Sequence, residues 1–221
     1  MYDWFDFLRV CLFCYKYEPP VDILCNSCWA GYEGLSKRQF TTTSLNYEFP
    51  VKRVWVWGKN NNYEIKKVIY SLKGGHSPKV YKKLSLLLLQ KIVFEYYNQR
   101  QIVFVPAPAL KPRKNHALYL SKALSELTGC QTIDLLSLGD GSKKQKKLGI
   151  KERKNREFRA STKFSISKKK QIIFIDDVIT TGSTARAAFK ALGRPAHFEV
   201  WVLAERLNVH SRRELKQKVA D

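Results

Sequence analysis

The sequence predicts an α/β fold in which a parallel sheet is flanked by helices and preceded by a small cysteine-rich module. Short apolar runs of β-forming residues alternate with amphipathic helical patterns, which is the order expected of a parallel sheet. Four of the five cysteines fall within the first 28 residues, ahead of the first such run. We therefore expect residues 1–45 to form the module and its linker, and residues 46–221 to form the α/β domain.

Each predicted element rests on a local pattern. Strands are runs of apolar, β-branched or aromatic residues closed by turn formers, as where Gly58 and three asparagines follow Trp57. Helices space their apolar residues three or four apart, as at Ile65, Ile69 and Leu72. In chain order the predicted elements are a strand at 51–57, helices at 63–72 and 81–97, a strand at 102–105, a helix at 116–127, strands at 132–138 and 171–175, a helix at 183–192 and a strand at 197–204.

The chain is strongly basic. Its 221 residues include 40 Lys and Arg against 19 Asp and Glu, which gives a formal net charge of +21 and a pI near 9.8. A hydrophobic content of 44% excludes a disordered tail, because it suffices for a packed core. Such an excess of positive charge predicts a polyanionic partner, and both nucleic acid and an anionic membrane surface fit that description.

The sequence predicts neither a membrane span nor a secretory signal. The longest apolar run, at residues 84–89, is interrupted by Ser85 and ended by Gln90 and Lys91, so it falls short of the ~20 residues needed to cross a bilayer. The N-terminus carries acids where a signal peptide has a positive start. We therefore expect a cytoplasmic protein.

The clustered cysteines form two Cys-x-x-Cys pairs separated by ten residues. This spacing lets four thiolates converge on one tetrahedral Zn²⁺, and with all four positions filled the site would be structural. Disulfides or redox-active pairs are the alternatives. Aromatic neighbours such as Trp29 would either stack on bases or form the core of the module. Cys130 stands apart and is predicted to be a small buried hydrophobe. The predicted zinc ligands are Cys11, Cys14, Cys25 and Cys28.

The segment at residues 172–184, IIFIDDVITTGST, carries the clearest chemistry in the chain. Four apolar residues predict a buried strand that leads to Asp176 and Asp177, and a Thr-Thr-Gly turn then opens a helix. At the carboxyl edge of a parallel sheet, a helix N-terminus offers N–H groups to a phosphate, while carboxylates accept hydrogen bonds from sugar hydroxyls or help to hold Mg²⁺. The alternative is a surface turn in which an aspartate caps the helix and the threonines satisfy backbone groups.

This string resembles the phosphoribosyl-pyrophosphate (PRPP) binding signature of the type I phosphoribosyltransferases, which has four apolar residues, two acids and a Thr-Thr-Gly-x-Thr loop in this order. The resemblance implies a type I phosphoribosyltransferase-like sheet, aspartates that contact the ribose hydroxyls, a loop that encloses the 5′-phosphate, and Mg²⁺ bound with PRPP. The PRPP-binding residues that it implies are Asp176, Asp177, Val178, Thr180, Thr181, Gly182, Ser183 and Thr184.

A Pro-Ala-Pro run follows the strand predicted at residues 102–105, where that fold has its pyrophosphate loop. Such a run is also a stiff turn that ends a strand. A nearby arginine could neutralise pyrophosphate oxygens or be an ordinary surface base. The candidates for the pyrophosphate loop are Pro106, Ala107, Pro108 and Arg113.

Residues 143–163 contain ten basic residues and only two acids. Such a run is usually a solvated face, but here it lies between two predicted strands whose ends should border the phosphate site. We expect it to act as a lid over the ligand, as a track for a nucleic-acid backbone, or as both. The nucleic-acid candidates are Lys143, Lys144, Lys146, Lys147, Lys151, Arg153 and Arg156.

With zinc knuckles first and a phosphoribosyltransferase-like domain after them, the chain resembles the ComF family of competence-associated proteins, including the ComFC type, over nearly its whole length. Further similarities lie at residues 63–65, 71–74 and 145–148. The chain departs from the family pattern at residues 112–117, which read PRKNHA where an Arg-Gly-aromatic-Asn-Gln-Ala run is common, and at Arg156, where an Asn is expected.

The ComF resemblance implies binding of a phosphoribosyl ligand and of single-stranded DNA, in DNA uptake and natural transformation. The residues leave enzymatic turnover open. One alternative is an active phosphoribosyltransferase in nucleobase or nucleotide metabolism, since that chemistry needs little beyond positioning and charge stabilisation. Another is a PRPP-sensing adaptor whose zinc module holds a helicase or another DNA-processing protein.

Overall fold

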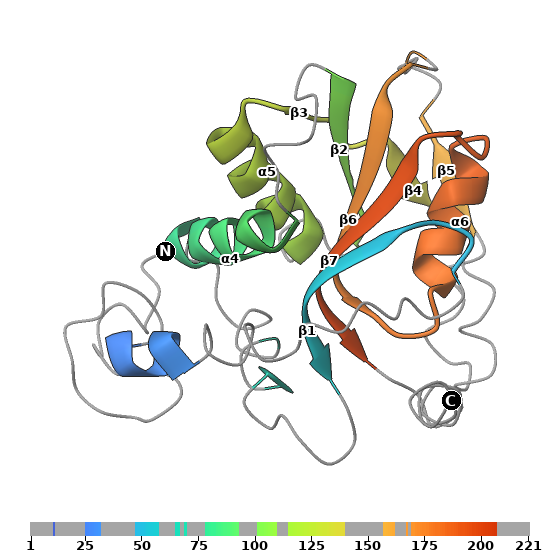
Figure 1. The fold of residues 1–221 in the computed structure, drawn as a ribbon. Helices are drawn as coiled ribbons and strands as arrows, with labels where there is room; N and C mark the ends of the chain where they lie inside the picture. Colours follow the sequence, from blue (N-terminus) through green and yellow to red (C-terminus); the bar gives the residue numbers. More distant parts are fainter. Residues whose placement is uncertain are drawn as a thin grey trace, which may run out of the picture.

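A five-stranded parallel sheet with helices on both faces forms the centre of the molecule (Figure 1). The structure is a computed structural model, and it describes residues 11, 25–31, 47–57, 65–66, 69, 78–92, 101–109, 115–139, 157–161, 167 and 169–206. The predicted α/β class and the predicted parallel sheet are confirmed.

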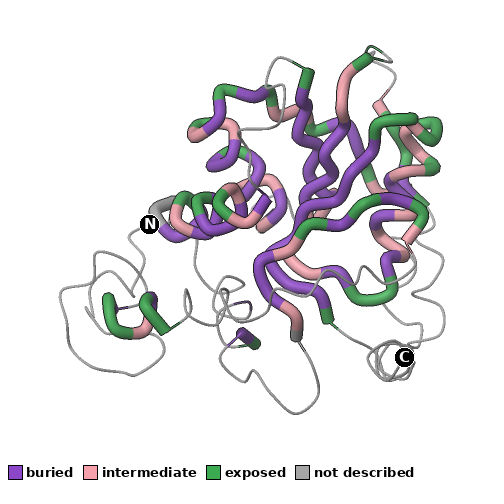
Figure 2. The backbone as a smooth tube through the Cα atoms, viewed as in Figure 1, coloured by how far each residue is buried: buried purple, intermediate pink, exposed green. Residues whose placement is uncertain are grey.

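The sheet has the order β1-β7-β6-β2-β3, and each neighbouring pair is parallel. Its strands are β1 (Val51–Trp57), β2 (Ile102–Pro106), β3 (Gln131–Thr132), β6 (Gln171–Ile179) and β7 (Phe198–Arg206). The central strands are buried almost without interruption (Figure 2). A strand covered by helices on both sides needs apolar residues at consecutive positions, and the IIFI run of β6 supplies them.

The two faces of the sheet carry separate cores. Helices α4 (Pro78–Ile92) and α5 (His116–Thr128) cover one face, and α6 (Ser183–Ala191) covers the other. Side chains alternate along β6, so Ile173 and Ile175 pack in the cluster with α4 and α5, while Ile172 and Phe174 pack in the cluster with α6.

Two helical connections leave the middle of the sheet in opposite directions. α5 joins β2 to β3 on one side, whereas α6 joins β6 to β7 on the other. Because such crossovers are right-handed, the two helices lie on opposite faces. β2 and β6 are neighbours, so the direction of winding reverses between them. In open α/β sheets, this reversal opens a crevice at the carboxyl ends of the two strands, where ligands bind.

The prediction of one continuous strand at residues 132–138 is wrong. β3 ends at Thr132, and the Leu135 N–H then donates to the Ile133 carbonyl at 3.1 Å, a three-residue turn that redirects the chain. The chain next forms β4 (Leu136–Leu138), which pairs antiparallel with β5 (Phe158–Ala160) in a separate two-stranded sheet. An apolar run that looks continuous is therefore divided between two sheets.

Other boundaries also differ. β6 runs four residues beyond the predicted end at Ile175, because its pairing with β7 continues to Ile179. α4 begins at Pro78 rather than at Tyr81, since proline suits the first turn of a helix. Ile65 and Ile69 are helical and buried, as their spacing predicted. The remaining residues of the 63–72 pattern, apart from Lys66, and the predicted end of the second helix at 93–97 lie outside the described residues.

In α4, the Ser85 hydroxyl is buried and has no hydrogen-bond partner among the described residues. Ser85→Ala removes this unsatisfied group and raises helix propensity, so we expect the free energy of unfolding to rise by about 1 kcal/mol, and the Tm by about 2–4 °C. Ser121→Ala in α5 is the matched control, because Ser121 is equally buried but its Oγ donates to the Ala117 carbonyl at 2.8 Å. In thermal unfolding only Ser85→Ala should gain stability, and a loss there would contradict this reasoning.

Candidate functional site

The carboxyl ends of β2 and β6 bring two of the predicted loops together. Pro106 is in register with Ile175, and the Ala107 N–H donates to the Ile175 carbonyl at 2.9 Å. The Pro-Ala-Pro run therefore lies beside the strand position that precedes Asp176. The structure places these two predicted elements on either side of the point where the winding reverses.

The side chains of Asp176 and Asp177 point to opposite faces of the sheet. Both aspartates lie within β6 rather than after it, so consecutive side chains point in opposite directions. Asp176 Oδ1 accepts from the Asp177 N–H at 2.9 Å, and Asp177 Oδ1 accepts from the Val178 N–H at 2.8 Å. Asp176 lines a hollow beside α6. Alternation places Asp177 on the same face as Ile173 and Ile175, towards α4. Burial, and next the charge of Asp177, raise the pKa of the Tyr81 hydroxyl on that helix.

After β6 the chain turns into α6 through Gly182, the N-cap residue, which has a φ of 72°. The N-cap glycine has no side chain with which to cap this helix, and the first turn contains no acidic residue. The Thr181 hydroxyl donates to Ser183 Oγ at 3.2 Å, and the Ser183 N–H donates to Thr181 Oγ1 at 3.4 Å. A threonine therefore satisfies a backbone group here, as the surface-turn alternative expects. The positive end of the helix dipole lies at the same turn, which suits an anion.

A small hollow of about 20 Å³, open to solvent, lies between this turn and the sheet. Its apolar lining is Phe174, Val178, Ile179, Ala185, Val200 and Val202. Its polar lining, together with the glycine, is Asp176, Thr180, Gly182, Ser183 and Thr184. Six of the eight residues predicted from the PRPP-binding signature thus line one hollow, and the other two, Asp177 and Thr181, adjoin it in the chain. The arrangement offers hydroxyls, backbone N–H groups and one carboxylate above an apolar floor.

A buried charge network beside the loop was missed in the sequence. Glu205, near the end of β7, is fully buried, and its Oε2 lies 3.0 Å from Arg53 Nε. The Tyr47 hydroxyl donates to Glu205 Oε1 at 3.3 Å. Burial raises the pKa of Glu205, and the charge of Arg53 and the Tyr47 hydrogen bond oppose that rise. The available signal was an acid inside an otherwise apolar strand, because such a group needs a partner.

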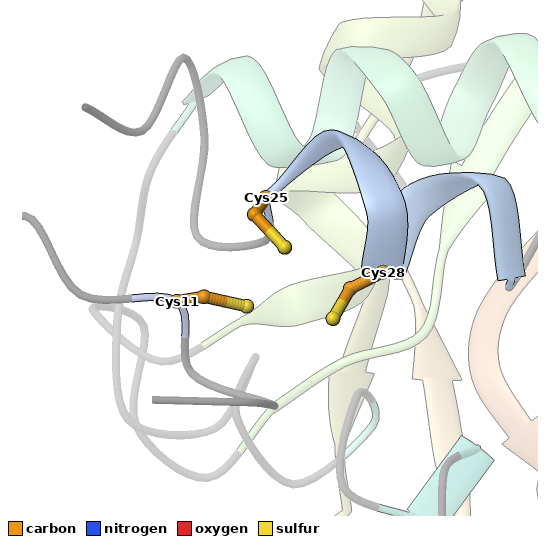
Figure 3. Close-up of side chains that lie close together, drawn as sticks. All are labelled: Cys11, Cys25 and Cys28. Carbon is orange, nitrogen blue, oxygen red and sulfur yellow. The ribbon is translucent and has the colours of Figure 1, made fainter. Parts of the chain in front are cut away.

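Three of the four predicted zinc ligands come together. The thiols of Cys11, Cys25 and Cys28 lie within 4.8 Å of one another and point into a common space (Figure 3). Cys25 directly precedes a short helix at residues 26–31, Cys28 lies within that helix, and Cys11 lies 14 residues before Cys25 in the chain. Three soft thiolates at this separation could hold a metal ion and suit Zn²⁺. Cys14 lies outside the described residues.

The metal-binding module packs on the sheet domain through α4. Trp29 is 5% exposed, and Lys83 Nζ lies 5.0 Å from the centroid of its ring. Cys11, Cys25 and Trp29 belong to the same apolar cluster as the buried face of α4. Trp29 is therefore a core residue and not an exposed stacking surface. Cys130, 3% exposed, is the buried hydrophobe that was predicted.

The basic stretch at residues 143–163 begins after β4 in the chain and includes β5. The Gly139 N–H donates to the Glu157 carbonyl at 3.0 Å, so the chain leaves and returns at one point. Leu136 and Phe158 pack in the same cluster as α6, the helix that follows Gly182. The nucleic-acid candidates Lys143, Lys144, Lys146, Lys147, Lys151, Arg153 and Arg156, like Arg113 of the pyrophosphate loop, lie outside the described residues.

No protein-family model matches this chain, and no curated protein matches it either. In the part of the chain that the structure describes, no helix has both the length and the apolar character needed to cross a membrane. The interpretation of the site therefore rests on its geometry and on the motif itself.

Gly182 is the position where the loop tolerates a side chain least. A Cβ there would lie 2.7 Å from Tyr47 Cε1, and the residue also has a left-handed φ. Gly182→Ala should cost more than about 2 kcal/mol in the free energy of unfolding, since strain of about 1–2 kcal/mol is added to the clash. Gly129→Ala is the matched control, because Gly129 has the same φ of 72° but nothing within 4 Å of the added Cβ. Equal losses in chemical denaturation would show that the Tyr47 contact is unimportant.

The thiol cluster predicts a metal dependence of stability. The purified chain should contain one Zn²⁺, Cys25→Ser should lose it, and Cys130→Ser should retain it, as measured by elemental analysis. Removal of the metal by a strong chelator should lower the Tm, because Cys25 shares a core with α4. A wild-type chain purified without metal, with a Tm that added Zn²⁺ does not change, would exclude a structural metal.

Proposed function

We propose that this protein is a ComF-like protein with a type I phosphoribosyltransferase-like domain, which binds PRPP or a related phosphoribosyl group together with single-stranded DNA in DNA uptake. The observation that carries the proposal is the position of the 172–184 motif. Its strand ends at the reversal of winding between β2 and β6, and its turn leads through the N-cap Gly182 into the N-terminus of α6 beside Asp176. Motif and position support the same class of ligand independently.

Each part of a phosphoribosyl ligand has a counterpart at this edge. The turn and the first residues of α6 offer N–H groups and hydroxyls to a 5′-phosphate. Asp176, at the rim of the hollow, can accept hydrogen bonds from ribose hydroxyls. The Pro-Ala-Pro run across the crevice stands where a pyrophosphate group would extend.

A carboxylate is the hard oxygen donor that Mg²⁺ prefers, and Asp177, on the face of the sheet opposite to Asp176, is a residue that fits this ion. Bound Mg²⁺ would neutralise part of the pyrophosphate charge. Asp176 would then orient the sugar, and the α6 N-terminus would hold the phosphate at the opposite end of the ribose. In this proposal the aspartates divide their work between the two faces to which they point.

The proposed DNA partner rests on charge. The net charge of +21 exceeds what a small phosphorylated ligand requires, and eight basic residues lie in the excursion between β4 and β5. The two strands that flank this excursion pack in the same apolar cluster as α6.

Calorimetric titration with PRPP and Mg²⁺ tests the ligand half of the proposal. We expect saturable binding, weakened at least about tenfold by Asp176→Asn, because a charge-assisted hydrogen bond contributes about 1.5–3 kcal/mol. Glu126→Gln removes an exposed carboxylate on α5 and should bind as wild type does. Failure of the wild-type chain to bind would refute the proposed ligand. Pyrophosphate release with one nucleobase from a panel would instead identify an active transferase.

The same preparation tests the DNA half. Affinity for a short single strand should fall steeply with salt concentration. For each phosphate neutralised, log K falls by about 0.7 per tenfold rise in salt. Changing Lys143, Lys144, Lys146 and Lys147 to Ala should reduce that slope. An equal loss of charge at the exposed residues Lys66, Lys82, Lys122 and Lys190 is the control and should have a smaller effect. Negligible binding at low salt would remove DNA from the proposal.

A further inference from the structure

Tyr47 contacts the turn at residues 180–184, although the two are far apart in the sequence. A Cβ added to Gly182 would meet Tyr47 Cε1 at 2.7 Å and Cδ1 at 3.0 Å, so the ring lies directly against the glycine backbone. Gly182 is buried, whereas Thr180 and Thr181 on the same turn are exposed. The Tyr47 ring therefore covers one side of the turn at its tightest point.

Tyr47 is held in place at both ends. Its hydroxyl donates to Glu205 Oε1 at 3.3 Å, and the buried Glu205 is paired with Arg53. Its ring stacks on Phe49, with the centroids 6.1 Å apart and the planes 2° from parallel. Burial, followed by the charge of Glu205, raises the pKa of Tyr47, so the hydroxyl stays protonated and remains a donor. Rotation of the ring would leave a buried carboxylate without one of its partners, which is costly.

A second group fixes the same turn from α6. Arg186 donates from Nη2 to the Thr181 carbonyl, and its Nη1 would lie 3.4 Å from a Cβ on Gly182. The turn is thus held between the Tyr47 ring and the Arg186 guanidinium. An anion-binding turn gains affinity when its N–H groups already point at the ligand, because no ordering is then needed on binding.

We propose that Tyr47 is a positioning residue that holds the turn at residues 180–184 in its anion-binding conformation. The segment between the metal-binding module and β1 then helps to set the affinity for a phosphate monoester. This inference rests on the proposed function, in which the turn binds the 5′-phosphate. Tyr47 acts through Gly182 and touches no reacting atom.

The test measures binding of ribose 5-phosphate to the full chain, from the NMR shift of the Gly182 amide and by calorimetry. Tyr47→Ala removes both the ring and the hydroxyl and should weaken binding about tenfold or more. Tyr47→Phe keeps the ring against Gly182 and loses only the hydrogen bond to Glu205, so it should weaken binding only about threefold. Leu88→Ala is the control for stability, because Leu88 is fully buried in α4 on the opposite face; its Tm should fall while its affinity is unchanged.

The outcomes separate this inference from the function on which it rests. If the wild-type chain does not bind ribose 5-phosphate, the proposed function fails and this inference fails with it. If the wild type binds and Tyr47→Ala binds equally well, only the role of Tyr47 is overturned. The same holds if Leu88→Ala weakens binding as much as Tyr47→Ala, since the effect would then follow stability alone. Recovery of affinity in Tyr47→Phe supports a role of the ring that a general loss of stability would not produce.

Discussion

The reversal of winding between β2 and β6 is the constraint on which the rest of the structure depends. One crossover leads from β2 to β3 and the other from β6 to β7, so the two strands must be neighbours whose following loops separate to opposite faces. That separation leaves a space between the two loops at the carboxyl edge of the sheet. The Pro-Ala-Pro run and the turn before α6 border this space.

Charged groups lie on both sides of the sheet at its carboxyl edge. On the α6 side, the helix N-terminus and Arg186 are positive, and Asp176 is the carboxylate that lines the hollow. On the other side, Asp177 lies near the Tyr81 hydroxyl, which is 2.9 Å from His116 Nδ1. An acidic pair at consecutive strand positions therefore gives each face one carboxylate. Beside it, Glu205 is buried with Arg53 and Tyr47 as partners, which keeps an uncompensated charge out of the core.

The described residues of the cysteine-rich segment pack on the sheet domain. Trp29 packs under Lys83 of α4, and Cys11, Cys25 and Trp29 share an apolar cluster with the buried face of that helix. Tyr47, which precedes β1, packs against Gly182 on the other face. These described cysteines and Trp29 are thus part of the core of the sheet domain.

The sequence by itself determined the α/β class, the central apolar strand, the helix after Gly182 and the grouping of Cys11, Cys25 and Cys28, because each depends on local periodicity, turn chemistry or short spacing. It could not determine that residues 132–138 divide between two sheets, since either pairing suits the same apolar residues. It also could not show that Asp176 and Asp177 lie within β6, because the length of a strand is set by its neighbour. Only the tertiary structure brought Tyr47, Arg53 and Glu205 together beside Gly182, since their meeting depends on the strand order, which no local pattern encodes.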